Sequence, residues 1–276
     1  MGKTQGGEKK GIGALNWTLL LVIGFSAQIA WVIENNWFAN FLYSDFGAQL
    51  GVVTAMTICS ATATTFSALF FGTLSDRIGS RKKLITWGSV LWGIFTIAFG
   101  LTHYLRDSIY NDVMLVGVTI VAADTIMSFF GSMANDAGYN AWYADMMDDS
   151  NSGQIGAVAA TLPVIGTLVG TLVGGMFVTG LATEANPQAG YIIFFSVAGG
   201  VTILVGIASF FLLKDAPTLK PVKASFTKTF SMCDLLVALG VKESDTKTKI
   251  AIDAVFANGV NMINDSPFLS DAAASV

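Results

Sequence analysis

The sequence predicts an all-α polytopic membrane protein: a bundle of six transmembrane helices followed by a cytoplasmic tail. Only 12% of the 276 residues are charged and 53% are hydrophobic, whereas soluble domains carry about 25% charged residues. The mean hydropathy is +0.62. The apolar residues also fall into six blocks, each of roughly 20 residues or more, the length that a helix needs to cross a bilayer core ~30 Å thick.

The six blocks divide the chain into three parts. The blocks cover residues 17–42, 49–73, 84–105, 113–143, 154–182 and 190–213. We therefore expect an N-terminal cytoplasmic segment (1–13), a transmembrane bundle (14–213), and a cytoplasmic linker and tail (214–276). No seventh span is expected, because the later apolar stretch 250–263 is too short and too polar to cross.

The first block is rich in aromatic and amide side chains. Gln28, Trp31 and Asn35 lie near one helical face, and Glu34 points about 100° away from Asn35. Ionisable groups inside a span are costly and by default face a cavity or a partner. Glu34 is therefore either a functional group or an acid near the surface that reaches the outer headgroups.

The second and fifth blocks each carry a stripe of small residues at helical spacing. Such stripes allow helices to pack closely in lipid. The second block has Thr57, Ala61, Thr65, Ala68 and Gly72, and the fifth has Gly166, Gly170 and Gly174. We expect helix packing, and no direct ligand role, for these residues. Pro163 in the fifth block is tolerated in a membrane helix.

The fourth block carries the strongest candidate for a cavity lining. Its polar stripe has spacings of four, three, four and four residues, with Asp136 beside it. The stripe is Asp124, Ser128, Gly131, Asn135 and Tyr139. The alternative is that these groups hold neighbouring helices together by hydrogen bonds. After the stripe, we expect Trp142 and Tyr143 at the inner interface, and Asp145, Asp148 and Asp149 as solvated loop residues.

Lysine and arginine near the spans predict the orientation of the chain. With the N-terminus inside, every basic residue except Arg106 lies on the cytoplasmic side. We therefore expect a multi-pass protein of the cell membrane with both termini cytoplasmic. The first ten residues are a lead into the first span, because the apolar stretch that follows is too long for a secretory signal.

The link after the second block, "GTLSDRIGSRKK" at residues 72–83, is unusually charged. The four basic residues of this link are enough to hold it on the cytoplasmic side of the membrane. They do not explain why glycine, acid and base follow one another in this order. That order resembles the signature loop of the major facilitator superfamily, G-x-x-x-D-R-x-G-x-R-K. The matching residues are Gly72, Asp76, Arg77, Gly79, Arg81 and Lys82. We call residues 72–83 the gating loop.

The resemblance covers residues 14 to about 230 and implies a fold and a role. Members of this superfamily have twelve spans in two six-helix halves, each made of 3+3 inverted repeats, with substrate between the halves. The resemblance implies that the gating loop steadies the outward-open state by contacting the second half, and that helices one and four line the central path. The chain departs from the family in two respects. It supplies only one half, and between the fourth and fifth blocks Ser152 and Gln154 stand where the family has a basic residue that mirrors the one in the gating loop.

The sequence shows no motif for metal binding, nucleotide binding, hydrolysis or nucleic-acid binding. There is no cluster with metal-ligand spacing, no phosphate-binding loop and no hydrolase triad, and the basic residues are too scattered for a nucleic-acid surface. The single histidine, His103, falls at the outer end of the third block. We expect no enzyme, no cofactor and no metal.

These observations predict a secondary active transporter, here its N-terminal half, that moves a small organic solute by alternating access coupled to H⁺ or Na⁺. Asp124 is the first candidate for the coupling site, and its alternative is a permanently paired structural carboxylate. The aromatic and amide groups of the first block favour a sugar or glycoside, and the alternative is that they serve a drug or an amphiphile. These groups are Trp31, Asn35, Asn36 and Trp37. The expected partners are the bilayer, the solute with its ion, and a second six-helix half or a second copy of the chain. The alternative function is a transport-incompetent fragment or partner subunit.

Overall fold

The computed structural model describes residues 13–48, 50–105, 113–184, 186–217 and 219–223, and every regular element in these ranges is helical. The elements are α1 (Ala14–Val32), η1 (Ile33–Trp37), α2 (Phe38–Phe41), η2 (Leu42–Phe46), α3 (Leu50–Ile78), α4 (Lys82–Leu101), η3 (Thr102–Leu105), α6 (Val113–Ala134), η4 (Asn135–Tyr139), α7 (Asn140–Asp145), α8 (Ser152–Gly180) and α9 (Ala189–Leu212). Residues 1–12 and 224–276, and with them most of the predicted tail, lie outside the described residues.

Six helical units are long and apolar enough to cross a membrane, which confirms the predicted number and order of spans. They are Ala14–Phe46, Leu50–Ile78, Lys82–Leu105, Gly117–Asp145, Ser152–Gly180 and Ala189–Leu212. The second unit runs five residues beyond its predicted end. Asp76 and Arg77 therefore lie in the last turn of α3, and the link to α4 is only three residues long.

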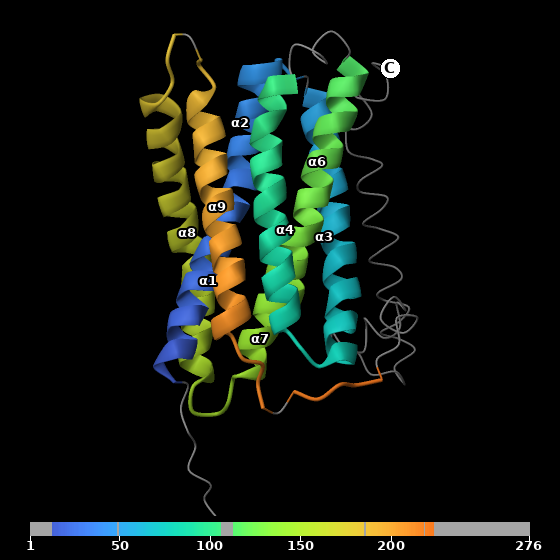
Figure 1. The fold of residues 1–276 in the computed structure, drawn as a ribbon, viewed down its shortest axis with the longest axis vertical. Helices are drawn as coiled ribbons and strands as arrows, with labels where there is room; N and C mark the ends of the chain where they lie inside the picture. The colour runs from blue at the N-terminus through green and yellow to red at the C-terminus, as the bar shows by residue number, and fades with distance from the viewer. Residues whose placement is uncertain (1–12, 49, 106–112, 185, 218, 224–276) are drawn as a thin grey trace, which may run out of the picture. The chain divides into compact units, whose positions relative to one another are not determined.

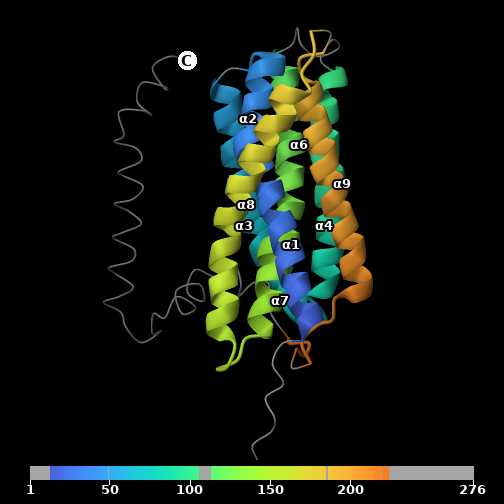
Figure 2. The same cartoon turned by 90° about the vertical axis from the view of Figure 1, so that its left-hand side faces the viewer.

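The six units stand side by side in one bundle (Figures 1 and 2). α4 is central and packs against both α6 and α9; α3 packs against α6, and α1 packs against α8 and α9. The gating loop lies at the lower end of the bundle in Figure 1. We call this end the basic end, because it carries Arg77, Arg81, Lys82 and Lys83.

The first and fourth spans contain π-helical segments, which the sequence analysis did not anticipate. η1 follows α1, η2 ends the first span, and η4 joins α6 to α7. At η1 the N–H of Phe38 bonds to the oxygen of Ile33, and at η4 the N–H of Asn140 bonds to that of Asn135. Each such wide turn rotates the following side chains relative to a regular helix, and π-segments often mark functional sites.

The glycine stripe of α8 packs against α1, as predicted. A Cβ placed on Gly166 would lie 2.4 Å from the Cβ of Gln28, and one on Gly170 would lie 3.0 Å from Val32. The absence of a side chain therefore lets the two helix backbones approach closely.

The small stripe of α3 has no packing partner among the described residues, so its predicted role in helix packing stays a prediction. Thr57, Ala61 and Thr65 are exposed, and no atom lies within 4 Å of a Cβ placed on Gly72. α3 is the least buried of the six spans, followed by α8. Both helices thus leave a face uncovered by the described residues.

Candidate transport site and gating loop

A polar cavity of about 210 Å³ lies between the first, fourth and fifth spans. α1 contributes Gln28, η4 contributes Asn135 and Tyr139, α7 contributes Asn140 and Tyr143, and α8 closes the cavity near Pro163. All of these polar groups are amides or phenols. The cavity therefore offers hydrogen bonds without a formal charge, which suits an uncharged polar solute.

Several polar atoms beside this cavity have no hydrogen bond in the described part of the chain. Ser26 Oγ, Trp92 Nε1 and Asn135 Oδ1 are all buried and unpaired, and their residues line a small pocket that shares Asn135 and Tyr139 with the cavity. The Nδ2 of Asn135 donates to Asp136 at 2.9 Å. Tyr139 is engaged, because its hydroxyl donates to the oxygen of Leu20 at 2.7 Å.

Two buried acids meet between the first and fourth spans. Glu34 is 7% exposed and Asp124 is 1% exposed. The Ser128 hydroxyl lies 2.5 Å from Glu34 Oε1 and 2.8 Å from the backbone oxygen of Asp124. Ser60 of α3 lies near the Asp124 carboxylate, but its hydroxyl donates to the oxygen of Thr57 at 3.2 Å. Glu34 Oε2 and both carboxylate oxygens of Asp124 are buried without a hydrogen bond from the described residues.

No lysine or arginine in the described ranges pairs with Glu34, Asp124 or Asp136. A buried carboxylate without a cation or hydrogen-bond donors is costly. Binding of a proton or a cation at this pair of acids would remove that cost. The burial of Glu34 also excludes the alternative that this acid reaches the outer headgroups in this conformation.

The predicted residues of the first span are distributed over different surroundings. Gln28 lines the polar cavity. Trp31 packs against Trp92 of α4 with 5.0 Å between ring centroids and an angle of 58° between the ring planes. Asn35 is exposed and donates to the oxygen of Trp31 at 2.8 Å. The three side chains thus do not form one binding surface. Gln28 and Trp31 have different surroundings within α1, and Asn35 lies in η1, beyond the regular turns of α1.

The stripe of the fourth span is likewise divided. Asp124 and Ser128 lie beside Glu34, whereas Asn135 and Tyr139 line the polar cavity. Gly131 packs on the ring of Trp92, where a Cβ would lie 2.8 Å from that ring. Asn140 and Tyr143 were not predicted as cavity residues. Asn140 lies beside the stripe, and Tyr143, which continues its spacing of four, had been assigned to the inner interface.

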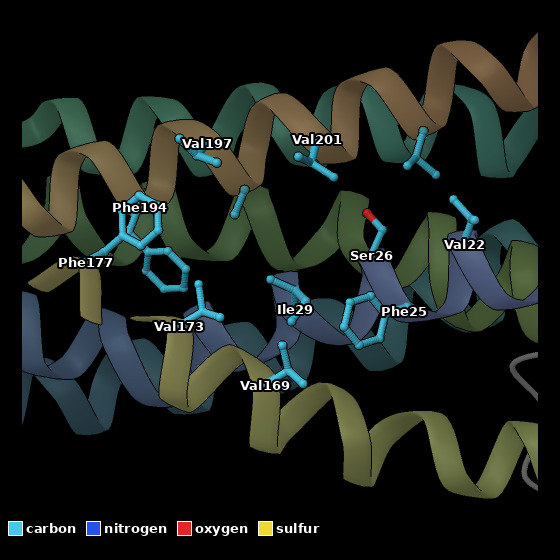
Figure 3. Close-up of a pocket in the computed structure, with 12 residues that line it drawn as sticks. Val22, Phe25, Ser26, Ile29, Val169, Val173, Phe177, Phe194, Val197 and Val201 are labelled. Atoms are coloured by element: carbon cyan, nitrogen blue, oxygen red, sulfur yellow. The ribbon is translucent and has the colours of Figure 1, made fainter. Parts of the chain in front are cut away.

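A larger groove of about 360 Å³ lies between α1, α8 and α9 (Figure 3). Its lining is apolar apart from Ser26, and includes Val22, Phe25, Ile29 and Val201. Hydrocarbon fits such a lining, whereas a polar solute would lose its hydrogen bonds to water there. The smaller polar cavity is therefore the candidate solute site.

At the basic end, Arg81 joins α3 to the end of the fourth span. Its Nη2 lies 2.7 Å from Asp76 and its Nε lies 3.0 Å from Asp145, and its Nη1 also donates to Ser75 Oγ. Burial lowers the pKa of Arg81, but the hydrogen bond to Asp145 and the charges of Asp76 and Asp145 outweigh it and raise the pKa. Arg81 therefore stays charged between two acids.

The other residues of the gating loop surround this ion pair. Gly79 has φ +67°, a left-handed conformation that favours glycine. Lys82 Nζ lies 5.3 Å from the centre of the Phe210 ring, and Arg77 is exposed. The gating loop is thus a compact turn fixed by one buried arginine.

Two predictions about the end of the fourth span were wrong. Asp145 is not a solvated loop residue, because Arg81 holds it. Trp142 is not at an exposed interface: it is fully buried, and its Nε1 donates to the oxygen of Lys214 at 3.0 Å. Both corrections depend on contacts between residues far apart in the sequence.

The family comparison agrees with this geometry. A family model described as Major Facilitator Superfamily matches residues 20–268. The chain belongs to the major facilitator superfamily. Its six described spans fit one half of that fold, and it is a multi-pass membrane transporter of this superfamily. The match extends beyond residue 230, where the sequence resemblance ended. No curated protein and no solved structure matches the chain significantly.

Proposed function

We propose that this superfamily member is the N-terminal half of a secondary active transporter that moves a neutral, hydroxylated organic solute such as a sugar or glycoside. The observation that carries the proposal is the polar cavity between α1, α7 and α8. Amide and phenol groups line it, and no charged side chain of the described residues does. Such groups hydrogen-bond hydroxyls and leave a formal charge on a solute uncompensated.

The basis for the sugar assignment shifts from the first span to this cavity. Asn36 is exposed, and Trp37 packs against Tyr191 and Phe194 of α9. The ring of Trp31 packs against the ring of Trp92. Stacking of a sugar ring on the tryptophans of the first span therefore has no support in this conformation, whereas Gln28, Asn135 and Asn140 support hydrogen bonding to hydroxyls.

We further propose that Glu34 and Asp124 carry the coupling ion, H⁺ or Na⁺. The two acids and Ser128 bring the first and fourth spans together, and Asn135 and Tyr139 continue the fourth span into the cavity. An ion that neutralises the acids changes how these two spans pack, and so provides a physical route from ion binding to solute binding.

The alternative function is a transport-incompetent fragment or membrane partner that requires a separate second half. The uncovered faces of α3 and α8 favour a requirement for more protein around this bundle. A channel formed by two copies of the chain is a third candidate, and it predicts cross-linked dimers with flux that ignores ion gradients.

Uptake into proteoliposomes that contain the chain together with a second six-helix half tests the proposal. The probes are radiolabelled glucose, galactose and lactose, with glutamate and lysine as charged controls, each with an imposed H⁺ gradient, an imposed Na⁺ gradient or neither. We expect accumulation of at least one sugar that collapses with one gradient. Accumulation of only a charged solute would contradict the solute class, and uptake unaffected by collapse of both gradients would contradict coupling.

A further inference from the structure

The segment that follows the last span is attached to the gating loop. The described residues 213–217 and 219–223 leave α9 and run beneath the basic end of the bundle toward α3 (Figure 1). Leu213 is fully buried, and the oxygen of Lys214 accepts the hydrogen bond from Trp142. We call residues 213–223 the strap. The sequence analysis had assigned them only to a cytoplasmic linker.

The first attachment is the carboxylate of Asp215. Its Oδ1 accepts the backbone N–H groups of Arg81 at 2.7 Å and Lys82 at 2.9 Å, and its Oδ2 accepts the Ser80 hydroxyl at 2.7 Å. These N–H groups begin α4, where no preceding turn supplies acceptors and where the helix dipole favours a negative charge. Hydrogen bonds to a carboxylate are stronger than neutral ones.

The second attachment is formed by Pro221 and Val222, which follow Asp215 by six and seven residues. It lies at the end of α3. The N–H of Val222 donates to the backbone oxygen of Asp76 at 2.9 Å. Pro221 packs on Gly79, where a Cβ would lie only 2.8 Å from the proline ring. The strap thus holds both sides of the gating loop, α4 through Asp215 and α3 through Val222.

The consequence concerns the position of Arg81. Its backbone is fixed by Asp215 while its side chain spans Asp76 and Asp145. We call the ion pairs of Arg81 with Asp76 and Asp145 the latch. We propose that the strap keeps the latch closed, and that Asp215 is the positioning residue that sets Arg81 between its two acids. A pull on the chain after residue 223 would then act on the latch. The gating part of this inference rests on the proposed function, whereas the attachment itself does not.

Hydrogen–deuterium exchange of the full-length chain in lipid nanodiscs tests the attachment without any solute. The variants are Asp215→Ala, Asp215→Asn and Asp215→Glu, with Glu184→Gln as a control, because Glu184 is an exposed acid outside the strap. Fragmentation that resolves single amides reports Arg81, Lys82 and Val222.

We expect the Arg81 and Lys82 amides to exchange at least about tenfold faster in Asp215→Ala and Asp215→Asn, because each loses a charge-assisted bond. The Val222 amide should also exchange faster, because release of the strap at Asp215 weakens its second attachment at Asp76. Asp215→Glu should retain most of the protection, because it keeps the charge at the start of α4, and Glu184→Gln should match the wild type.

Two results would overturn the inference. One is unchanged protection of Arg81 and Lys82 in Asp215→Ala. The other is faster exchange that spreads equally through the middle of α9, which would show general unfolding and no specific role for the carboxylate. Neither result bears on sugar uptake, so failure of the strap and failure of the proposed function are distinguishable.

Discussion

At the scale of single residues, the bundle holds acids in two different settings. Asp76 and Asp145 hold a buried arginine at the basic end, whereas Glu34 and Asp124 lie inside the bundle without a basic partner among the described residues. The first pair suits a latch that opens and closes. The second pair suits a site that an ion occupies.

Asp76→Asn tests the latch. The amide keeps the shape of the side chain but removes the charge that faces Arg81, so the latched state is less stable. We expect maximal sugar uptake to fall about tenfold, the effect of losing one charge-assisted bond, with KM changed by less than about twofold. A large change in KM with an unchanged maximal rate would place Asp76 in solute binding instead.

Asp124→Asn and Glu34→Gln test the coupling site. Each variant removes a group that an ion can neutralise, so we expect sugar accumulation against its gradient to disappear while exchange of sugar across the membrane persists. Glu184→Gln is the control, since this exposed acid lies far from Glu34 and Asp124 in sequence and contributes to neither site. Gradient-driven accumulation that survives in both variants would assign these acids a structural role.

Much of the residue-scale chemistry was predictable, but the contacts were not. The gating loop, Glu34 and Asp124 were identifiable because charge in an apolar chain is conspicuous. The salt bridge from Arg81 to Asp145 and the bonds to Asp215 join residues 64 and 134 positions apart. A single sequence contains no signal for such pairs.

At the scale of helices, length and apolar composition were sufficient to predict six spans, and the glycine stripe predicted close packing of α8, although not that α1 is its partner. The internal register was not predictable. η1 and η4 add a wide turn within the first and fourth spans, so side chains beyond Val32 and Ala134 face directions that a regular helix does not give. The two spans that carry the buried acids Glu34 and Asp124 are therefore the ones whose faces were predicted least well.

Gly166→Ala tests the contact between α1 and α8. The added methyl group would meet the Cβ of Gln28 at 2.4 Å, and overpacking of this kind costs about 1–3 kcal/mol. Gly175→Ala is the matched control in the same helix, because its new methyl group would meet nothing closer than 3.9 Å. Thermal unfolding in detergent should show a lower midpoint for Gly166→Ala only; equal midpoints would contradict the close packing.

At the scale of the whole molecule, the bundle resembles one half of a larger transporter. α3 and α8 expose apolar residues such as Ile58, Phe66, Leu168 and Leu172. Thr57, Ala61 and Thr65 of the small stripe of α3 are also exposed in the part of the chain that the structure describes. A second half packed on these faces would complete the solute path. The need for a partner stays a prediction, and the structure shows which faces the described residues leave uncovered.

Extension of the chain tests this requirement. We expect no gradient-driven sugar uptake from the 276-residue chain alone, and uptake when it is extended by, or co-expressed with, six further spans from the neighbouring reading frame. Coupled uptake by the chain alone at a rate that the extension does not increase would support two copies of this bundle instead.

The central claim is that the latch lies on the cytoplasmic side of a six-span bundle. Lys83→Cys, in a background where Cys59 and Cys233 are replaced by serine, tests it most directly, because Lys83 is exposed beside the gating loop. A membrane-impermeant maleimide should label this cysteine in inside-out vesicles and fail to label it in right-side-out vesicles. Labelling only in right-side-out vesicles would contradict the predicted orientation and the role of the loop as an inner gate.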